Sequence, residues 1–96
     1  MKVKPADIAK EVLEAKENKT VLFGVKQVMK ALKHGELSKV IYSNTLPETI
    51  EDELKHYAEL KEVKVDEFVG NSAELGVVAK RAHGISMLGF FKGEKR

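Results

Sequence analysis

Short apolar runs alternate with amphipathic stretches along this chain, and this alternation restricts the fold more than any other feature. The apolar runs have the length of strands and cover residues 20–23, 39–43, 63–69 and 85–91. The amphipathic stretches have the length of helices and cover residues 5–18, 24–34, 47–61 and 71–80. Such alternation is typical of a sheet covered by helices on both faces. We therefore expect an α/β fold, namely a three-layer α/β/α sandwich with a central mixed four-stranded sheet.

Turn and capping residues support these boundaries. Asn71 and Glu74 have the N-x-x-E spacing of a capping box. Gly35 can adopt the left-handed conformation that ends a helix, and Thr45 or Leu46 is expected to cap the helix of residues 47–61. That helix has one apolar face, which we expect to be buried and which consists of Ile50, Leu54, Tyr57, Ala58 and Leu60. Residues 20–23 are apolar without alternation, which predicts a strand buried on both sides.

The length of 96 residues corresponds to one domain, residues 1–96, in which residues 93–96 are expected to be a frayed tail. There is no cysteine, so disulfides and thiol chemistry are excluded. No apolar run has the roughly 20 residues that a membrane helix needs, so no membrane contact is expected. The amino terminus has neither the apolar segment nor the cleavage site of a secretion signal, which favours a cytoplasmic protein.

Charge is distributed unevenly along the chain. The net charge is only +2, but residues 16–44 contain six lysines and two acids. Residues 45–79 contain three lysines and nine acids, and residues 80–96 contain five basic residues and one acid. If the two basic segments lie together in the fold, they form a positive face. A positive face on a nearly neutral protein is typical of nucleic-acid binding.

Residues 21–33 combine the end of a predicted strand with a basic amphipathic helix. Gly24 lies at the junction, where free backbone N–H groups and the positive end of the helix dipole suit a phosphate. The apolar face of this helix consists of Val25, Val28, Met29 and Leu32. Its opposite face carries Lys26, Lys30 and Lys33, with Gln27 nearby. A lysine stripe is also typical of an ordinary solvated helix face, so this segment alone leaves both interpretations open.

Motifs for enzymatic chemistry are missing. The glycines form neither a dinucleotide-binding fingerprint nor a phosphate-binding P-loop. The three histidines are 22 and 27 residues apart, and none has a partner at helical spacing for a metal. The acidic cluster at the start of residues 47–61 complements the dipole of that helix. We therefore expect no catalytic residues, no metal site and no cofactor.

Three segments together resemble one family. Gly24-Val25-Lys26-Gln27-x-x-Lys30 resembles the G-x-[KN]-[QSE]-x-x-K signature of the kink-turn RNA-binding ribosomal proteins, the L30e/L7Ae group. Residues 42–47, Tyr-Ser-Asn-Thr-Leu-Pro, are similar to a strand end followed by Asn and a Pro-initiated helix in that family. Residues 67–76 with Arg81-x-His83 resemble archaeal L30e members in particular. The resemblance covers about residues 6–92.

This resemblance implies a non-catalytic protein that clamps a kink-turn. Lys26 and Gln27 would contact purine edges and the adjacent phosphate, Lys30 a phosphate, and Asn44 the backbone near the bend. Arg81 and His83 would lie near an extruded nucleotide, where a histidine ring can stack on the base. The full set of candidate RNA-binding residues is Gly24, Val25, Lys26, Gln27, Lys30, Lys33, Asn44, Arg81, Ala82 and His83.

The implied partner is a kink-turn RNA, ribosomal RNA in the first place, together with other ribonucleoprotein subunits. The protein would be a large-subunit ribosomal protein or a paralogue in another ribonucleoprotein, and a monomer when free. A second hypothesis keeps the same fold but assigns it to protein interaction in translation or ribosome rescue. In that case the acidic helix of residues 47–61 would be the docking surface.

Overall fold

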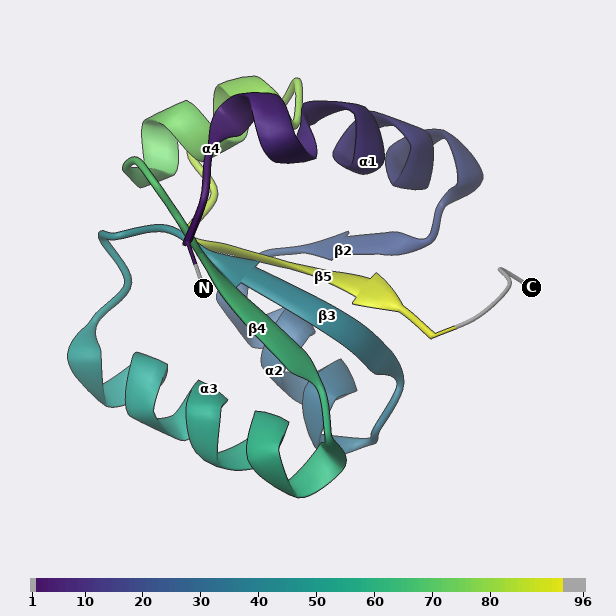
Figure 1. Cartoon of the computed structure of the whole chain (residues 1–96), viewed down its shortest axis with the longest axis vertical. Helices are drawn as coiled ribbons and strands as arrows, with labels where there is room; N and C mark the ends of the chain where they lie inside the picture. Colours follow the sequence, from purple (N-terminus) through teal and green to yellow (C-terminus); the bar gives the residue numbers. More distant parts are fainter. Residues whose placement is uncertain (1, 93–96) are drawn as a thin grey trace.

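The computed structural model describes residues 2–92 (Figure 1). The predicted tail, Gly93 to Arg96, lies outside the described residues. The helices are α1 (Pro5–Asn18), α2 (Val25–Lys33), α3 (Glu48–Lys61) and α4 (Ser72–Val78). The strands are β1 (Lys2–Val3), β2 (Val21–Phe23), β3 (Leu37–Tyr42), β4 (Lys64–Phe68) and β5 (Met87–Phe91).

The sheet is mixed, and its strands are arranged in the order β1-β4-β3-β5-β2. β1, β4 and β3 run parallel, whereas β5 is antiparallel to both of its neighbours, β3 and β2. The expected α/β sandwich is confirmed, but the expected count of four strands is wrong, because the sheet has five. The additional strand, β1, consists of two residues paired with Glu67 and Phe68. A strand this short has no detectable alternation of its own.

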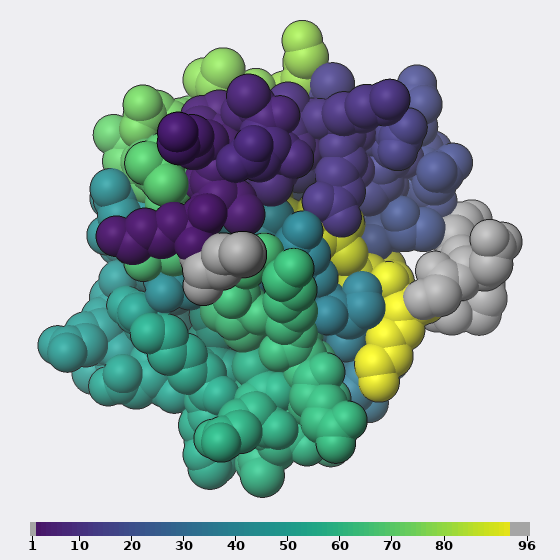
Figure 2. All heavy atoms as spheres, viewed as in Figure 1, coloured from purple at the N-terminus to yellow at the C-terminus, as the bar shows by residue number. Residues whose placement is uncertain are grey.

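Helices cover both faces of the sheet. In Figure 1, α1 and α4 lie on one side of the strands, and α2 and α3 lie on the other. The space-filling view shows the same division, with α1 in purple and α3 in teal on opposite sides of the molecule (Figure 2). Each layer encloses its own apolar core. The α1/α4 core includes Ile8, Val12, Ile41, Phe68, Leu75 and Leu88, and the α2/α3 core includes Val28, Leu32, Leu37, Val40, Leu54 and Met87.

Helix caps agree with the sequence in one place and differ in another. Asn71 caps α4, since its side chain accepts a hydrogen bond from the Glu74 amide at 2.9 Å, and the Glu74 carboxylate accepts from the Asn71 amide at 2.9 Å. The predicted capping box is therefore confirmed. In α3 the cap is Pro47 and not Thr45 or Leu46. Proline has no N–H to satisfy and a fixed φ, which suits the entry to a helix.

Two expectations about burial were wrong. β2 is half-buried rather than buried on both sides, because it is an edge strand with β5 as its neighbour. Leu60 of α3 is 62% exposed, whereas Leu54 and Ala58 on the same helix are buried. Among the described residues, no helix has the length and apolarity that a membrane crossing requires.

Candidate nucleic-acid interface

The candidate residues from distant parts of the sequence meet at one end of the sheet. The Gly24 amide donates to the Met87 carbonyl oxygen at 3.0 Å, and the Ser43 amide donates to the Ser86 carbonyl oxygen at 2.9 Å. The turns that follow β2 and β3 therefore lie on either side of the start of β5. Asn44 is exposed on this rim, and its amide donates to the Gly70 carbonyl oxygen after β4 at 3.0 Å.

The start of α2 is an open helix terminus. Gly24 is the N-cap, with φ of 102° and ψ of 143°, a conformation that favours glycine. The first bond of the helix runs from the Val28 amide to the Gly24 carbonyl oxygen at 3.0 Å. The N–H groups of the residues between them have no partner within the helix, and they point out of its positive end.

Acidic side chains are missing from this terminus. The first turn of α2 contains no acid, whereas α1 has Asp7, α3 has Glu48 and Glu51, and α4 has Glu74 at the corresponding positions. Among the helices of the described residues, α2 alone thus leaves its positive end uncompensated. Lys26 adds a cation there, so an anionic ligand would relieve the unfavourable charge.

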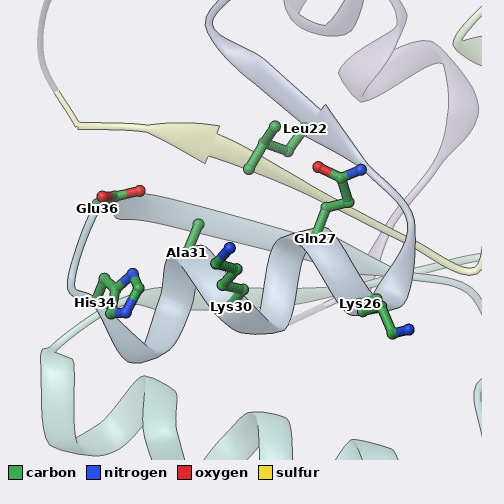
Figure 3. A pocket seen from close by; sticks show the side chains of 7 residues that line it. All are labelled: Leu22, Lys26, Gln27, Lys30, Ala31, His34 and Glu36. Atoms are coloured by element: carbon green, nitrogen blue, oxygen red, sulfur yellow. The ribbon is translucent and has the colours of Figure 1, made fainter.

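A groove runs along α2 beside β2. It has a volume of about 390 Å³ and is lined by Leu22, Lys26, Gln27, Lys30, Ala31, His34 and Glu36. Figure 3 shows the Gln27 side chain directed toward Leu22 of β2, while the Lys26 side chain extends away from the helix at its start. Lys26, Gln27 and Lys30 are exposed. The groove therefore offers two cations and an amide near the start of α2, with His34 and the carboxylate of Glu36 at its far end.

Lys33, the third lysine of the predicted stripe, has a different environment. Its ammonium lies 3.6 Å from a Glu53 carboxylate oxygen and 5.1 Å from the centre of the Tyr57 ring, both on α3. α3 thus engages this charge, whereas Lys26 and Lys30 line the groove. Of the three lysines, Lys33 is the least available to a ligand at the start of α2.

The loop between α4 and β5 brings the second basic segment to the same place. A pocket of about 250 Å³ is lined by Phe23, Gly24, Val25, Arg81, His83, Gly84, Ile85 and Ser86. The Arg81 guanidinium lies 4.5 Å from the centre of the Phe23 ring. Ala82 is exposed between Arg81 and His83. The structure therefore brings Arg81 and His83 next to the start of α2.

Close backbone packing holds this loop against α4. A Cβ atom at Gly76 would lie 2.5 Å from the His83 carbonyl oxygen, so only glycine allows this approach. The Ile85 amide donates to the Ser72 carbonyl oxygen at 2.9 Å. Both contacts fix the loop at its far end from Arg81. The position of His83 is thus set by α4 and not by contacts within the loop alone.

The turn after β3 is held by polar contacts with α3. The Tyr42 hydroxyl donates to the Glu51 carboxylate at 3.0 Å, and Lys55 lies 2.9 Å from the same carboxylate. These partners, Lys55 first and Tyr42 second, lower the pKa of Glu51. Burial and the Glu51 hydrogen bond raise the pKa of Tyr42. Glu51 therefore has a structural role in joining α3 to the end of β3.

Comparison with known proteins decides the family. Residues 6–95 match the model of the ribosomal protein L7Ae/L30e/S12e/Gadd45 family. The chain belongs to this family. Relatives include the large ribosomal subunit protein eL30 of Methanocaldococcus jannaschii, 30% identical over 85% of this chain and 74% of that protein. The eL30 of Pyrobaculum calidifontis is 34% identical over 85% of this chain and 81% of that protein.

These findings confirm the resemblance to archaeal L30e members. The prediction that the chain is not an enzyme is confirmed as well by the family match and by the eL30 relatives, which are named as ribosomal subunit proteins. The fold recurs in a solved structure from Bacillus halodurans, described as a protein with unknown function. It has a TM-score of 0.79 and 23% identity over 92% of this chain and 87% of that chain. This likeness bears on the fold only.

Two residues that line these pockets, Phe23 and His34, were not among the predicted site residues. Phe23 lies beneath Arg81, and His34 ends the groove along α2. The sequence signal for Phe23 was available, since an aromatic residue directly precedes Gly24 at the end of a predicted strand. His34 was assigned to the end of the helix only. The described residues contain no group of three or more acidic, histidine or cysteine side chains suited to a metal ion.

Proposed function

We propose that this protein is a non-catalytic, cytoplasmic RNA-binding protein that recognises a kink-turn, either in the large ribosomal subunit or in another ribonucleoprotein. It would act as a monomer when free, without a cofactor. Its eL30 relatives, which are named as ribosomal subunit proteins, support the assignment to ribosomal RNA. The finer proposal, a bent RNA, rests on the arrangement of the candidate residues.

The observation that carries this proposal is the open terminus of α2 beside the loop of Arg81 and His83. The terminus lacks an acid in its first turn and lies at the wall of the pocket that the loop also lines. A phosphate would bind to the free N–H groups and to Lys26. An unstacked base would enter beside His83, which is how proteins usually read RNA, because the A-form major groove is too narrow for side chains.

Gly24 and Val25 line one of the two hollows, and Lys26, the next residue along the chain, lines the other, so a ligand that occupies both passes the start of α2. One groove follows α2 with Lys26, Gln27 and Lys30, and the other follows the loop with Arg81 and His83. A sharply bent backbone with an extruded nucleotide can reach both, and Asn44 on the adjacent rim would contact the backbone near the bend.

The test is a gel-shift titration with a kink-turn RNA and with an unkinked duplex of equal length. We expect tighter binding of the kink-turn and a salt dependence of log K with a slope of about −2 to −4, for two to four neutralised phosphates. Equal affinity for the two RNAs would contradict kink-turn recognition and leave general basic attraction.

Variants locate the interface. Lys26→Ala and Lys30→Ala should each weaken binding and reduce the salt slope by about 1, as expected for a lysine that contacts a phosphate. Lys10→Ala is the matched control, because Lys10 is an exposed lysine of α1 on the opposite face of the sheet. If the Lys26 and Lys30 variants bind as tightly as the Lys10 variant, the interface lies elsewhere.

Protein interaction through α3 is a second candidate. The exposed Leu60 supports it, since this apolar side chain lies on a helix whose surface is largely acidic. Glu51 is engaged by Tyr42 and Lys55, so Asp52 and Glu59, which are exposed, are better probes. Charge reversal at both should abolish binding of a protein partner and leave RNA affinity unchanged.

A further inference from the structure

Lys16 of α1 forms an unusual long-range contact with the end of α4. Its ammonium donates to the carbonyl oxygen of Ala79 at 3.1 Å and to that of Lys80 at 2.9 Å. The side chain is half-buried. These bonds cross 63 and 64 residues of sequence, and they reach the two residues that directly precede Arg81.

The two carbonyl groups lie directly after α4, whose last turn contains no cation. α4 ends at Val78, and its last turn contains no basic residue. The end of a helix carries partial negative charge and unpaired carbonyl groups, which a lysine can satisfy. In this protein that lysine comes from a different helix. Lys16 therefore supplies the positive charge at the C-terminal end of α4, which a basic residue in the last turn of the same helix usually supplies.

The hydrogen bonds of Lys16 also hold a residue with an unfavourable backbone conformation, Lys80. Lys80 has φ of 57°, in the left-handed region that is unfavourable for residues other than glycine. Directly after it, the Arg81 amide donates to the Gly76 carbonyl oxygen at 2.9 Å. The chain thus reverses at Lys80, and this reversal directs Arg81 toward Phe23. A bond to the Lys80 carbonyl holds that peptide in place.

Lys16 does not line the pocket that contains Arg81 and His83. We infer that Lys16 is a positioning residue for RNA recognition, which holds the loop of Arg81–His83 in the orientation that receives the extruded nucleotide. This inference rests on the proposed function. It assigns to α1, on the far side of the sheet from α2, a part in binding that no motif of the sequence indicates.

The test compares Lys16→Met, Lys16→Arg and the control Lys10→Met. Each is titrated with a kink-turn RNA and with the same RNA lacking the extruded nucleotide. Methionine keeps the apolar stem and removes the donors, whereas arginine keeps charge and donors. We expect Lys16→Met to lose affinity for the complete RNA by about 2-fold to 30-fold, the range found for residues that act through neighbours. Lys16→Arg and Lys10→Met should stay within about 2-fold of the parent.

The RNA without the extruded nucleotide should bind equally well to Lys16→Met and to the parent. Equal losses for both RNAs, or a loss of thermal stability without a loss of affinity, would overturn the inference and leave Lys16 as a general structural residue. In an Arg81→Met background, Lys16→Met should have little further effect, because the residue through which it acts is gone.

Amide hydrogen exchange of the free protein provides a readout that does not depend on RNA. Lys16→Met should accelerate exchange at Arg81 and Ile85, whose amides are bonded to α4, and leave α2 unchanged. Unchanged exchange in the loop would overturn the inference. If the parent protein does not prefer the kink-turn, the proposed function fails, and this measurement still decides whether Lys16 holds the loop.

Discussion

The guanidinium of Arg81 lies 4.5 Å from the centre of the Phe23 ring. Phe23 is the last residue of β2, and Arg81 belongs to the loop before β5, so this contact joins the two walls of one pocket. Because Arg81 is exposed, its guanidinium can contact a phosphate or a base while it keeps this contact with the ring. The pair therefore belongs to the candidate interface and also joins its two walls.

Phe23→Leu should weaken RNA binding while the fold is retained. A cation–π contact at an exposed site contributes about 0.5 to 1 kcal/mol, so the affinity for a kink-turn RNA should fall by about 2-fold to 5-fold. Phe23→Tyr keeps an aromatic ring and should bind like the parent. Titrations of both variants, with circular dichroism to verify folding, make the comparison. Equal affinities of the leucine and tyrosine variants would show that the ring has no part in binding.

Gly24→Ala should affect stability and binding together. The φ of 102° is strained for alanine, which costs about 1 to 3 kcal/mol of unfolding free energy. A Cβ at Gly24 would meet no protein atom within 4 Å, so the methyl group would project toward the ligand. Gly35→Ala is the control, since Gly35 also has positive φ, 72°, but lies at the other end of α2.

Urea denaturation and RNA titration separate the two effects of the glycine variants. We expect both Gly24→Ala and Gly35→Ala to be less stable than the parent, and Gly24→Ala alone to lose affinity by more than its instability explains. Similar affinity in both variants would indicate that the backbone of Gly24 is not approached by RNA.

Lys39→Met should destabilise the protein strongly. Asp66 is 1% exposed, and Lys39 lies 3.8 Å from one of its carboxylate oxygens and 3.1 Å from Glu11. Removing one partner of a buried ion pair leaves a buried charge and costs about 3 to 5 kcal/mol. The double variant Lys39→Met/Asp66→Asn should regain part of this loss. Chemical denaturation measures both, and a double variant less stable than Lys39→Met would contradict this account.

Glu51→Gln should change how the free energy of unfolding depends on pH in the acidic range. Lys55 and Tyr42 lower the pKa of Glu51 in the folded protein, so its stabilising contribution is present above the ordinary glutamate pKa of about 4.3. It is lost as the pH falls through the lower, folded pKa. The stability difference between parent and variant should therefore be largest near neutral pH and shrink below about pH 4. A difference that does not change with pH would exclude this contribution.

Much of the architecture could be predicted because local pattern and tertiary structure agree. Two helix boundaries lie where capping residues were recognised, namely the start of α4 at Asn71 and the end of α2 before Gly35. β1 could not be predicted, since it is a strand only through its pairing with β4. The prediction that β2 is buried on both sides was wrong for a similar reason, because the strand order places β2 at an edge of the sheet. An apolar run does not reveal its position in a sheet.

The candidate site could be predicted as a set of segments but not as a surface. The sequence suggested Lys26, Lys30 and Lys33 as one stripe, yet Lys33 is engaged by Glu53 on α3. Such an ion pair depends on how two helices pack, which spacing within one helix does not encode. Phe23 and Lys16 acquire their contacts with Arg81 and Lys80 in the same way, across more than fifty residues of sequence. Contacts between residues this far apart in the sequence can be identified only from the three-dimensional structure.

The position of β5 between β3 and β2 has a consequence for how the candidate interface is assembled. Within residues 2–92, β5 comes last along the sequence but is an interior strand of the sheet, and β2 pairs with it. Gly24 and Ser43 are both bonded to the start of β5. The candidate interface is therefore assembled only when β5 has paired with both β3 and β2, so residues 21–44 by themselves cannot form it.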